Sequence, residues 1–204
     1  GKIRRELGWS PRFDFAEGSD FRRAVARVSP ARTVPVLVDG DFSVWDTLAI
    51  AEYLHERFPD KGVWPTKPHD RARARSLCAE MHSGFGALRS HCPMNIEASL
   101  PQVGAKIWAE QAGVRANVER IEQMWAQALA DSGGPMLFGK FSAVDAFYAP
   151  VCMRLRTYGL PVSEATKAYI ERVAAVPGVA QWIADALAEK DYLDFEEPHR
   201  KART

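Results

Sequence analysis

Apolar residues follow two different spacings along the chain, and the change falls near residue 60. Residues 34–38 (VPVLV) and 42–45 (FSVW) are rich in β-formers, and the polar turn around Gly40 separates them. This pattern predicts an antiparallel hairpin. Apolar residues then recur every three or four positions from Leu48 to Phe58, which predicts a helix directly after the hairpin.

From about residue 69 onward, nearly the whole chain has helical spacing. The pattern predicts a bundle of about five amphipathic helices, over residues 70–90, 114–129, 142–158, 163–175 and 178–189. The stretch from Pro59 to Pro68 has several prolines and few apolar residues, which is typical of a linker. We therefore expect an α/β domain over residues 1–60 and an all-α domain over residues 69–204.

The start of the 142–158 helix has its own signal. Ser142 and Asp145 have the spacing of a capping box, and Phe141 stands at the hydrophobic staple position. We expect Asp145 to be buried and hydrogen-bonded as part of this cap, and a catalytic carboxylate is the alternative. Pro150 should remove one hydrogen bond within the helix and kink it.

Composition narrows the class of protein. The 204 residues include 27 basic and 26 acidic side chains, so no excess charge favours binding to nucleic acid or to an anionic membrane. No apolar run reaches the length of about 18 residues that a membrane-spanning helix needs. These features predict a soluble, cytoplasmic protein that binds neither nucleic acid nor membrane.

The cysteines and histidines give no sign of a metal or disulfide framework. Cys78, Cys92 and Cys152 are an odd number and are widely spaced, and no Cys-x-x-Cys pair occurs. The five histidines do not share a metal-binding spacing on one helix face. We predict no metal site and a reducing compartment.

Two residue pairs at one end of the hairpin suggest a binding site. Pro35 near a strand start indicates an edge, a bulge or a cis bond, and a cis Val34–Pro35 bond would turn the Val34 N–H and C=O outward. Asp46 and Thr47 stand where the helix begins, and free N–H groups there can receive a carboxylate. An acid beside a hydroxyl suits an amino-acid head group, whereas simple helix capping is the alternative.

These motifs resemble those of the cytosolic glutathione transferase family, in which a strand beginning Val-Pro is followed by an acid-Ser/Thr pair at a helix start. Two further strings resemble a bacterial branch of the family, and they are AEMHSGFGALR at 79–89 and PMN at 93–95. The string FGKFSAVDAFYAPV at 138–151 resembles the family's buried capping motif. The resemblance covers nearly the whole chain. It implies a thioredoxin-like N-terminal domain, incomplete at its start, followed by an all-helical bundle domain.

The resemblance also implies a function. The chain would use glutathione as a co-substrate, conjugate it to a small hydrophobic electrophile, act as a homodimer and hold no covalently bound cofactor. Val34 and Pro35 would bind the cysteinyl backbone of glutathione, and Asp46 and Thr47 its γ-glutamyl end. Arg32 is a weaker candidate for the glycyl carboxylate.

The electrophile pocket is implied at the end of the 70–90 helix and in the turn after it. The candidates that the resemblance suggests there are Met81, His82, Phe85, Met94 and Asn95. A Met or Phe at helical spacing is more often a core residue than a ligand contact. Cys92 is expected to be an inert thiol, and an exposed reactive thiol is the alternative.

The beginning of the chain is short for this family. Residues 13–16 are predicted as the second strand, 19–28 as the following helix and 1–7 as the end of the first helix. We therefore expect the first strand, and the loop whose hydroxyl or thiol activates glutathione, to lie upstream of Gly1. Ser10 is an alternative catalytic residue, although it is too close to Val34 in sequence.

Two other functions remain open. The fold could serve a non-catalytic binding or regulatory protein that uses the glutathione groove or a dimer surface. Alternatively, the chain could be a glutathione-dependent isomerase, dehalogenase or peroxidase.

Overall fold

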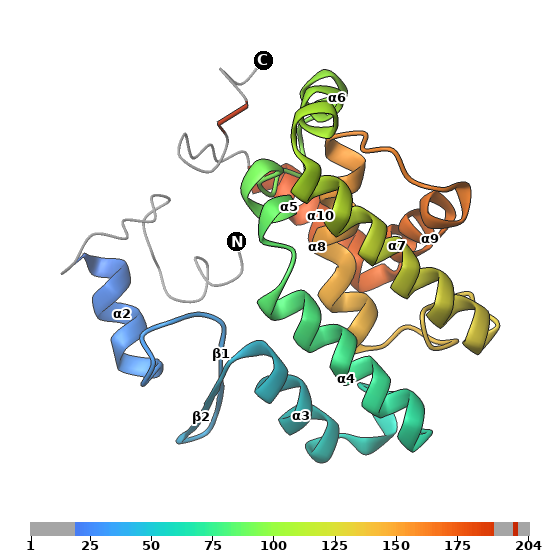
Figure 1. The fold of residues 1–204 in the computed structure, drawn as a ribbon. Helices are drawn as coiled ribbons and strands as arrows, with labels where there is room; N and C mark the ends of the chain where they lie inside the picture. The colour runs from blue at the N-terminus through green and yellow to red at the C-terminus, as the bar shows by residue number, and fades with distance from the viewer. Residues whose placement is uncertain (1–18, 190–197, 200–204) are drawn as a thin grey trace. The chain divides into compact units, whose positions relative to one another are not determined.

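The structure, a computed structural model, describes residues 19–189 and 198–199. The chain forms two compact units, Gly1–Val63 and Trp64–Thr204. The described elements of the first unit are α2 (Asp20–Val28), β1 (Val36–Asp39), β2 (Phe42–Trp45), α3 (Thr47–Arg57) and the 3-10 turn η1 (Pro59–Lys61) (Figure 1). The predictions for Ser10 and for residues 1–7 and 13–16 lie outside the described residues.

The helix predicted over residues 19–28 is confirmed as α2. Ser19 is its N-cap, and its Oγ accepts a hydrogen bond from the Arg22 N–H at 3.3 Å. A side-chain oxygen at this position satisfies one of the free N–H groups of the first turn. Val25 is the buried residue on the inner face of this helix.

The predicted hairpin is also confirmed. Val36 pairs with Trp45 and Asp39 pairs with Phe42 in an antiparallel register, and Gly40 in the turn has a φ of +61°. The first strand was predicted from residue 34, but it begins at Val36. Pro35 has no N–H to donate to a ladder, so regular pairing starts after it.

One face of the hairpin packs on α3. The rings of Phe42 and Tyr53 lie 5.7 Å apart between centroids, and the Tyr53 hydroxyl donates to Asp39 at 2.7 Å. Arg57 Nε lies 3.7 Å from the same carboxylate. These contacts fix the direction of α3 relative to the two strands.

The second unit is all-helical, as predicted, but it has seven described helices where about five were expected. They are α4 (Pro68–Ser83), α5 (Gly86–His91), α6 (Pro101–Glu110), α7 (Ala112–Ser132), α8 (Ala143–Thr157), α9 (Glu164–Ala175) and α10 (Pro177–Glu189) (Figure 1). The single helix predicted over 70–90 is divided at Gly84 and Phe85. Phe85 has a φ of +55°, which a continuous right-handed helix cannot include.

Helix α6 was not predicted, because Gly104 interrupts its pattern. A Cβ added at Gly104 would lie 1.7 Å from the carbonyl oxygen of Tyr158, so the helix crosses the end of α8 at a separation that only glycine permits. Pro101 occupies the first turn, where its missing N–H costs nothing. The glycine that weakens the sequence pattern is therefore the one that packing requires.

The centre of the second unit is α8, and its predicted cap is confirmed. Asp145 is fully buried and accepts hydrogen bonds from the N–H groups of Ser142 at 3.0 Å and Leu137 at 3.2 Å and from the Tyr169 hydroxyl at 2.9 Å. Burial raises the pKa of Asp145, and these donors act in the opposite direction. All three donors belong to the cap or to the neighbouring helix α9, which favours the cap over a catalytic carboxylate.

Aromatic contacts join α7, α8 and α9 around this cap. The Trp125 ring lies edge-on to Tyr148 at 5.4 Å and to Tyr169 at 4.8 Å. The Tyr148 hydroxyl donates to the Leu77 carbonyl at 3.0 Å, which ties α8 to α4. None of the described helices is both long and apolar enough to cross a bilayer.

Candidate functional site

The hairpin brings the two predicted binding pairs to one end of the first unit. Since Val36 pairs with Trp45, continuing the register outward brings Pro35 toward Asp46 and Val34 toward Thr47. The Val34–Pro35 peptide bond is cis, as the sequence suggested. Val34 is 48% exposed, which is unusual for a valine and leaves its backbone accessible.

The start of α3 offers hydrogen-bond donors beside this backbone. Asp46 is the N-cap, and its Oδ1 accepts from the Leu48 N–H at 2.8 Å, while its carbonyl accepts from Ile50 at 2.9 Å. Among the described hydrogen bonds, none uses the N–H groups of Thr47 and Ala49. A helix start with such donors and a threonine hydroxyl can hold a carboxylate.

Asp46 has a strained backbone. Its φ of +70° and ψ of +131° lie in a region that residues other than glycine rarely adopt. Such a conformation costs about 1–3 kcal/mol, and strained residues cluster at ligand clamps. Capping alone does not need this conformation, because an ordinary N-cap has an extended backbone.

The loop before Val34 is fixed by a second serine. Ser29 Oγ accepts from the Thr33 N–H at 3.2 Å, and the Ser29 carbonyl accepts from the Arg32 N–H at 3.0 Å. Arg32 has a φ of +57° and an exposed side chain. The charged side chain of Arg32 is therefore exposed two residues before Val34. Its contact with the glycyl carboxylate of glutathione stays a prediction.

The candidates for the electrophile pocket have different surroundings in the second unit. Met81 and Met94 are half-buried and His82 is exposed, whereas Phe85 and Asn95 are buried. Asn95 Oδ1 accepts from the Ala98 N–H at 2.8 Å, so this side chain shapes its own turn. These positions favour the two methionines over Phe85 and Asn95 as ligand contacts.

The thiol of Cys92 is inert in this structure. It is fully buried, and burial raises its pKa to about 11. Cys78 and Cys152 are also buried, and neither forms a disulfide. Within the part of the chain that the structure describes, no three His, Cys, Asp or Glu side chains gather as a metal site would require.

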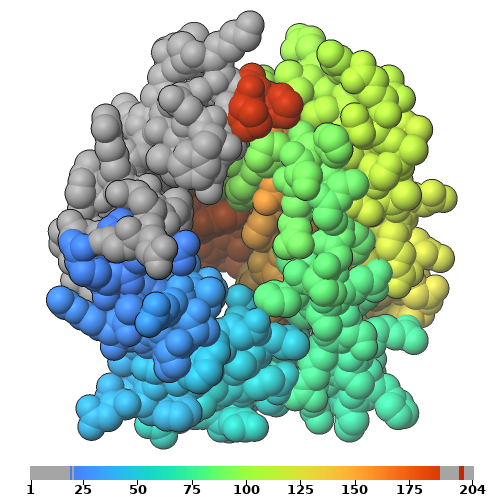
Figure 2. Space-filling model, turned by 60° about the vertical axis from the view of Figure 1, so that its left-hand side comes forward, coloured from blue at the N-terminus to red at the C-terminus, as the bar shows by residue number. Residues whose placement is uncertain are grey.

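The turn at residues 91–95 is held through its carbonyl groups, an arrangement that the sequence analysis missed. Three donors come from one face of α8 and one from near the C-terminus. The contacts run from Arg154 to Cys92, from Tyr158 to Pro93, from Thr157 to Asn95 and from His199 to His91. Figure 2 shows residues 198–199, in red, against the green surface that includes α5. The i, i+3, i+4 spacing of the α8 donors was visible in the predicted helix. The sequence did not show that they contact the carbonyl groups of the 91–95 turn.

Two hollows lie within the second unit. A polar groove of about 940 Å³ runs between α4 and α7, and an apolar hollow of about 420 Å³ lies between α8 and α10. The groove contains the ion pairs Arg73–Asp131 and Arg120–Glu80. None of the predicted electrophile contacts lines either hollow.

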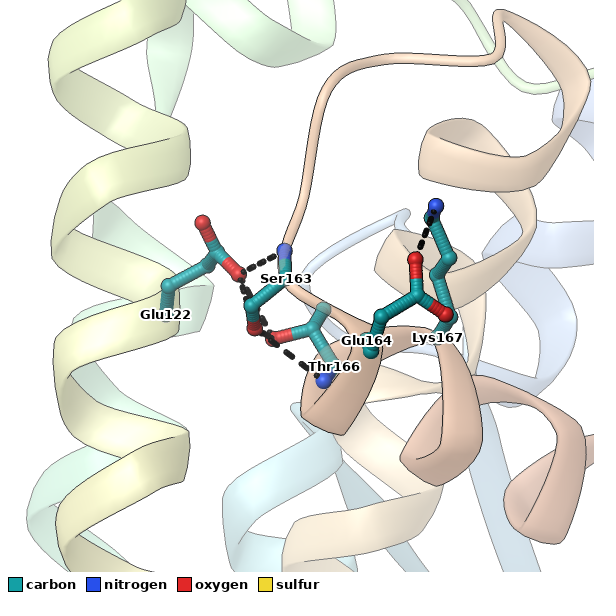
Figure 3. A network of polar contacts seen from close by, with 5 residues as sticks. All are labelled: Glu122, Ser163, Glu164, Thr166 and Lys167. Carbon is teal, nitrogen blue, oxygen red and sulfur yellow. Dashed lines mark hydrogen bonds and ion pairs between the residues drawn. The ribbon is translucent and has the colours of Figure 1, made fainter.

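A carboxylate joins α7 to α9 on another side of this unit. Figure 3 shows Glu122 accepting from the N–H and Oγ of Ser163, both at 2.8 Å, and from Thr166 Oγ1 at 2.7 Å. Burial acts to raise the pKa of Glu122, but these hydrogen bonds outweigh it and hold the pKa below its usual value. All partners are groups of the α9 cap, so the network is structural.

Comparison with known proteins gives matches in both units. The family model described as glutathione S-transferase, N-terminal domain, matches residues 4–62, and the one described as glutathione S-transferase, C-terminal domain, matches residues 106–198. A "Stringent starvation protein A homolog" of Haemophilus influenzae is 26% identical over 171 residues, which cover 82% of this chain and 74% of that protein.

Solved structures are similar over most of the chain. A glutathione transferase homolog from Burkholderia gl BGR1, with bound glutathione, has a TM-score of 0.59 and 27% identity, covering 78% of this chain and 76% of that one. A maleyl pyruvate isomerase of the Zeta class matches in fold, with a TM-score of 0.59, 19% identity and coverage of 83% and 81%. The first unit is thus a thioredoxin-like domain with a small described sheet, and a helical domain follows it. On these matches and its own motifs, the chain belongs to the glutathione S-transferase family.

Proposed function

We propose that the chain binds glutathione at the end of the hairpin, between the Val34 backbone and the start of α3. The observation that carries this proposal is the strand register, which directs Val34 and Thr47 to the same end of the sheet. The Thr47 hydroxyl and N–H would bind the γ-glutamyl carboxylate, and Asp46 the ammonium. The Burkholderia structure, which contains glutathione, supports this ligand.

The strain at Asp46 supports a role beyond capping. An N-cap with ordinary extended geometry would satisfy Leu48 equally well, so the positive φ of Asp46 has no use in the helix itself. The negative charge of Asp46 at this position is suited to an ammonium group of the ligand. The proposed glutathione-binding domain spans residues 1–60, and the proposed second domain spans residues 69–204.

The reaction that this site would serve is conjugation. The glutathione thiol loses its proton, the thiolate attacks an electrophilic carbon, and the leaving group departs with the electron pair of the broken bond. A hydrogen-bond donor near the sulfur would favour the thiolate. Ser10, the candidate for this donor within the chain, lies outside the described residues.

A non-catalytic binding protein is the second candidate. The stringent starvation protein A homologs that match about three quarters of their length carry a name that states no reaction. Under this alternative, the glutathione groove or a surface of the second unit would bind a partner.

Retention on immobilised glutathione tests the binding site. We expect the protein to be retained, and Thr47→Val and Asp46→Ala to elute at about tenfold lower glutathione concentration, since each loses a hydrogen bond to a charged group. Asp41→Ala is the matched control, because Asp41 is an exposed acid at the opposite end of the same hairpin. Equal elution of all four proteins would exclude this site.

Activity separates the two candidate functions. The transferase proposal requires that the protein conjugate glutathione to at least one member of a broad electrophile panel. Retention on glutathione without any conjugation would favour the binding protein.

We also propose that the protein is a cytoplasmic homodimer, formed across the α4–α7 groove. The two ion pairs in the groove have opposite senses: α4 contributes the cation in Arg73–Asp131 and the anion in Glu80–Arg120. A second copy turned by 180° would bring Arg73 of one copy to Glu80 of the other. A self-complementary surface of this kind is what a twofold interface requires.

A further inference from the structure

Two arginines lie near the end of α5, where the 91–95 turn begins. Arg154 extends from α8 and is half-buried, and its Nη1 donates to the Cys92 carbonyl at 2.5 Å. Arg89 lies in the last turn of α5, three residues before Cys92, and its side chain is exposed. A guanidinium has five N–H donors, so the single contact of Arg154 leaves most of its donors unused.

Neither arginine has a carboxylate partner within the described ranges. Some arginines of this unit do: Arg156 lies 3.7 Å from Glu171, and Arg120 binds both oxygens of Glu80. Arg71 and Arg115, by contrast, also donate only to backbone carbonyls. Arg89 and Arg154 make no further described contact. Arg154 differs from Arg71 and Arg115 in donating to one carbonyl where each of them donates to two.

The electrostatics at this point favour an anion. Burial lowers the pKa of the Arg154 guanidinium, Tyr158 and Cys92 act in the opposite direction, and the charge of Arg89 adds to the effect of burial. Two positive charges therefore repel each other in a partly desolvated place. An oxyanion between them would reverse this repulsion and would use the spare N–H donors in a paired geometry.

We propose that Arg154 and Arg89 bind an oxyanion, the carboxylate or phosphate group of a small organic molecule, at the end of α5. The site borders the turn that contains Met94. We assign the oxyanion to the second substrate, which would be an acidic rather than a neutral electrophile. This assignment rests on the proposed function.

The competing explanation is that Arg154 only caps α5. Cationic side chains commonly donate to the last carbonyls of a helix, and the Cys92 contact has this form. Capping, however, needs no second arginine, and it predicts no affinity for anions. The two explanations therefore differ in a measurable quantity.

The experiment measures the binding of phosphate, succinate and benzoate by isothermal titration calorimetry, without glutathione and at an ionic strength fixed with sodium chloride. We expect at least one of these anions to bind the unchanged protein. Arg154→Gln, which keeps a donor for the Cys92 carbonyl, and Arg89→Ala should each weaken binding about tenfold or more. Arg156→Ala should leave it unchanged within about twofold.

The pattern of ligands identifies the source of the oxyanion. Binding of succinate or benzoate alone indicates a carboxylate, and binding of phosphate alone indicates a phosphate ester. No binding of any anion above the chloride background, or equal weakening in all three arginine variants, would overturn the proposal. If Arg154→Gln fails to fold by circular dichroism, Arg89→Ala decides, because its exposed side chain has no described structural contact.

Glutathione binding is measured separately on the same variants. Retention of Arg89→Ala on immobilised glutathione, together with loss of anion binding, would support both proposals. If the unchanged protein is not retained on glutathione, the proposed function and the assignment of the oxyanion to the second substrate are both wrong. The calorimetry alone then decides whether the anion site exists.

Discussion

Asp46 combines two features that act in opposite directions on stability. Its side chain caps α3, which typically contributes about 1 kcal/mol, while its positive φ costs about 1–3 kcal/mol. A residue selected only for stability would be glycine, which adopts this backbone freely and caps almost as well. The presence of aspartate at this position therefore supports the proposal that its charge contacts the ligand.

This conflict predicts different effects for two substitutions. Asp46→Gly should leave the free energy of unfolding unchanged or raise it by about 1 kcal/mol, because relief of strain exceeds the lost cap. Asp46→Asn keeps the cap and should change it by less than about 0.5 kcal/mol. Both should weaken glutathione binding about tenfold, as urea denaturation and calorimetry would show.

Asp41→Asn is the control for loss of one negative charge, and it should alter neither quantity. If Asp46→Gly destabilised the protein by more than about 1 kcal/mol, the strain argument would be wrong. If Asp46→Asn bound glutathione normally, the ammonium contact would be wrong.

At the scale of elements, the crossing of α6 and α8 depends on one glycine. Gly104→Ala would place its Cβ 1.7 Å from the Tyr158 carbonyl oxygen, so the helices must separate. Overpacking costs about 1–3 kcal/mol, and the gain in helix propensity returns up to about 1. We expect Gly104→Ala to lower the free energy of unfolding by about 2 kcal/mol in urea denaturation.

Gly86→Ala is the matched control on α5. A Cβ there meets nothing within 4 Å, so the same change should stabilise the protein by about 0.5–1 kcal/mol. The two substitutions should therefore have opposite signs. A neutral Gly104→Ala would mean that α6 does not contact α8 this closely.

The contact between α7 and α9 should depend on pH through Glu122. Its folded pKa lies below the usual 4.5, because the hydrogen bonds from Ser163 and Thr166 outweigh burial. The stabilisation is therefore complete above about pH 4.5, and it is lost as the pH falls through the folded pKa. We expect Glu122→Gln to lower the free energy of unfolding by about 1 kcal/mol at pH 7, with the difference shrinking toward pH 3.

Glu119→Gln provides the comparison, since Glu119 is exposed on the same helix and makes no described polar contact. Its effect should be small at pH 7. A difference for Glu122→Gln that stayed constant between pH 7 and pH 3 would show that the carboxylate charge does not contribute to the α9 cap.

The sequence separation between interacting residues decides which elements could be predicted from sequence. The hairpin, α3 and the cap of α8 depend on residues within a few positions of each other, such as Gly40, Asp46 and Asp145, so local patterns reveal them. Helix α6 was missed because its key residue, Gly104, makes sense only beside Tyr158. The break at Phe85 does have a local signal, since Gly84 and Gly86 flank it, but the apolar spacing that continues across it favoured one helix.

The candidate site residues likewise differ in whether their partners are near them in sequence. Val34 and Thr47 were predicted because the hairpin itself relates them. The arginines at the end of α5 were not, because Arg154 is 62 residues from Cys92, whose carbonyl it meets. Helical spacing places Arg154 on a face of α8, but only the fold shows that the facing segment has no acid for it.

At the scale of the whole molecule, the proposed twofold across α4 and α7 makes a prediction about charge. Exchanging the residues of one pair, Glu80→Arg with Arg120→Glu, keeps the ion pair within each copy. Between the copies, however, the new positive charge at position 80 faces Arg73, and the new negative charge at position 120 faces Asp131. Since like charges across an interface are strongly unfavourable, we expect sedimentation equilibrium at micromolar concentration to give twice the chain mass for the unchanged protein and the single mass for the exchange. Adding Arg73→Glu with Asp131→Arg restores complementarity and should restore the dimer, an outcome that general destabilisation cannot produce. A monomeric unchanged protein would contradict the homodimer, and a dimer unaffected by the first exchange would mean that the twofold lies on another surface.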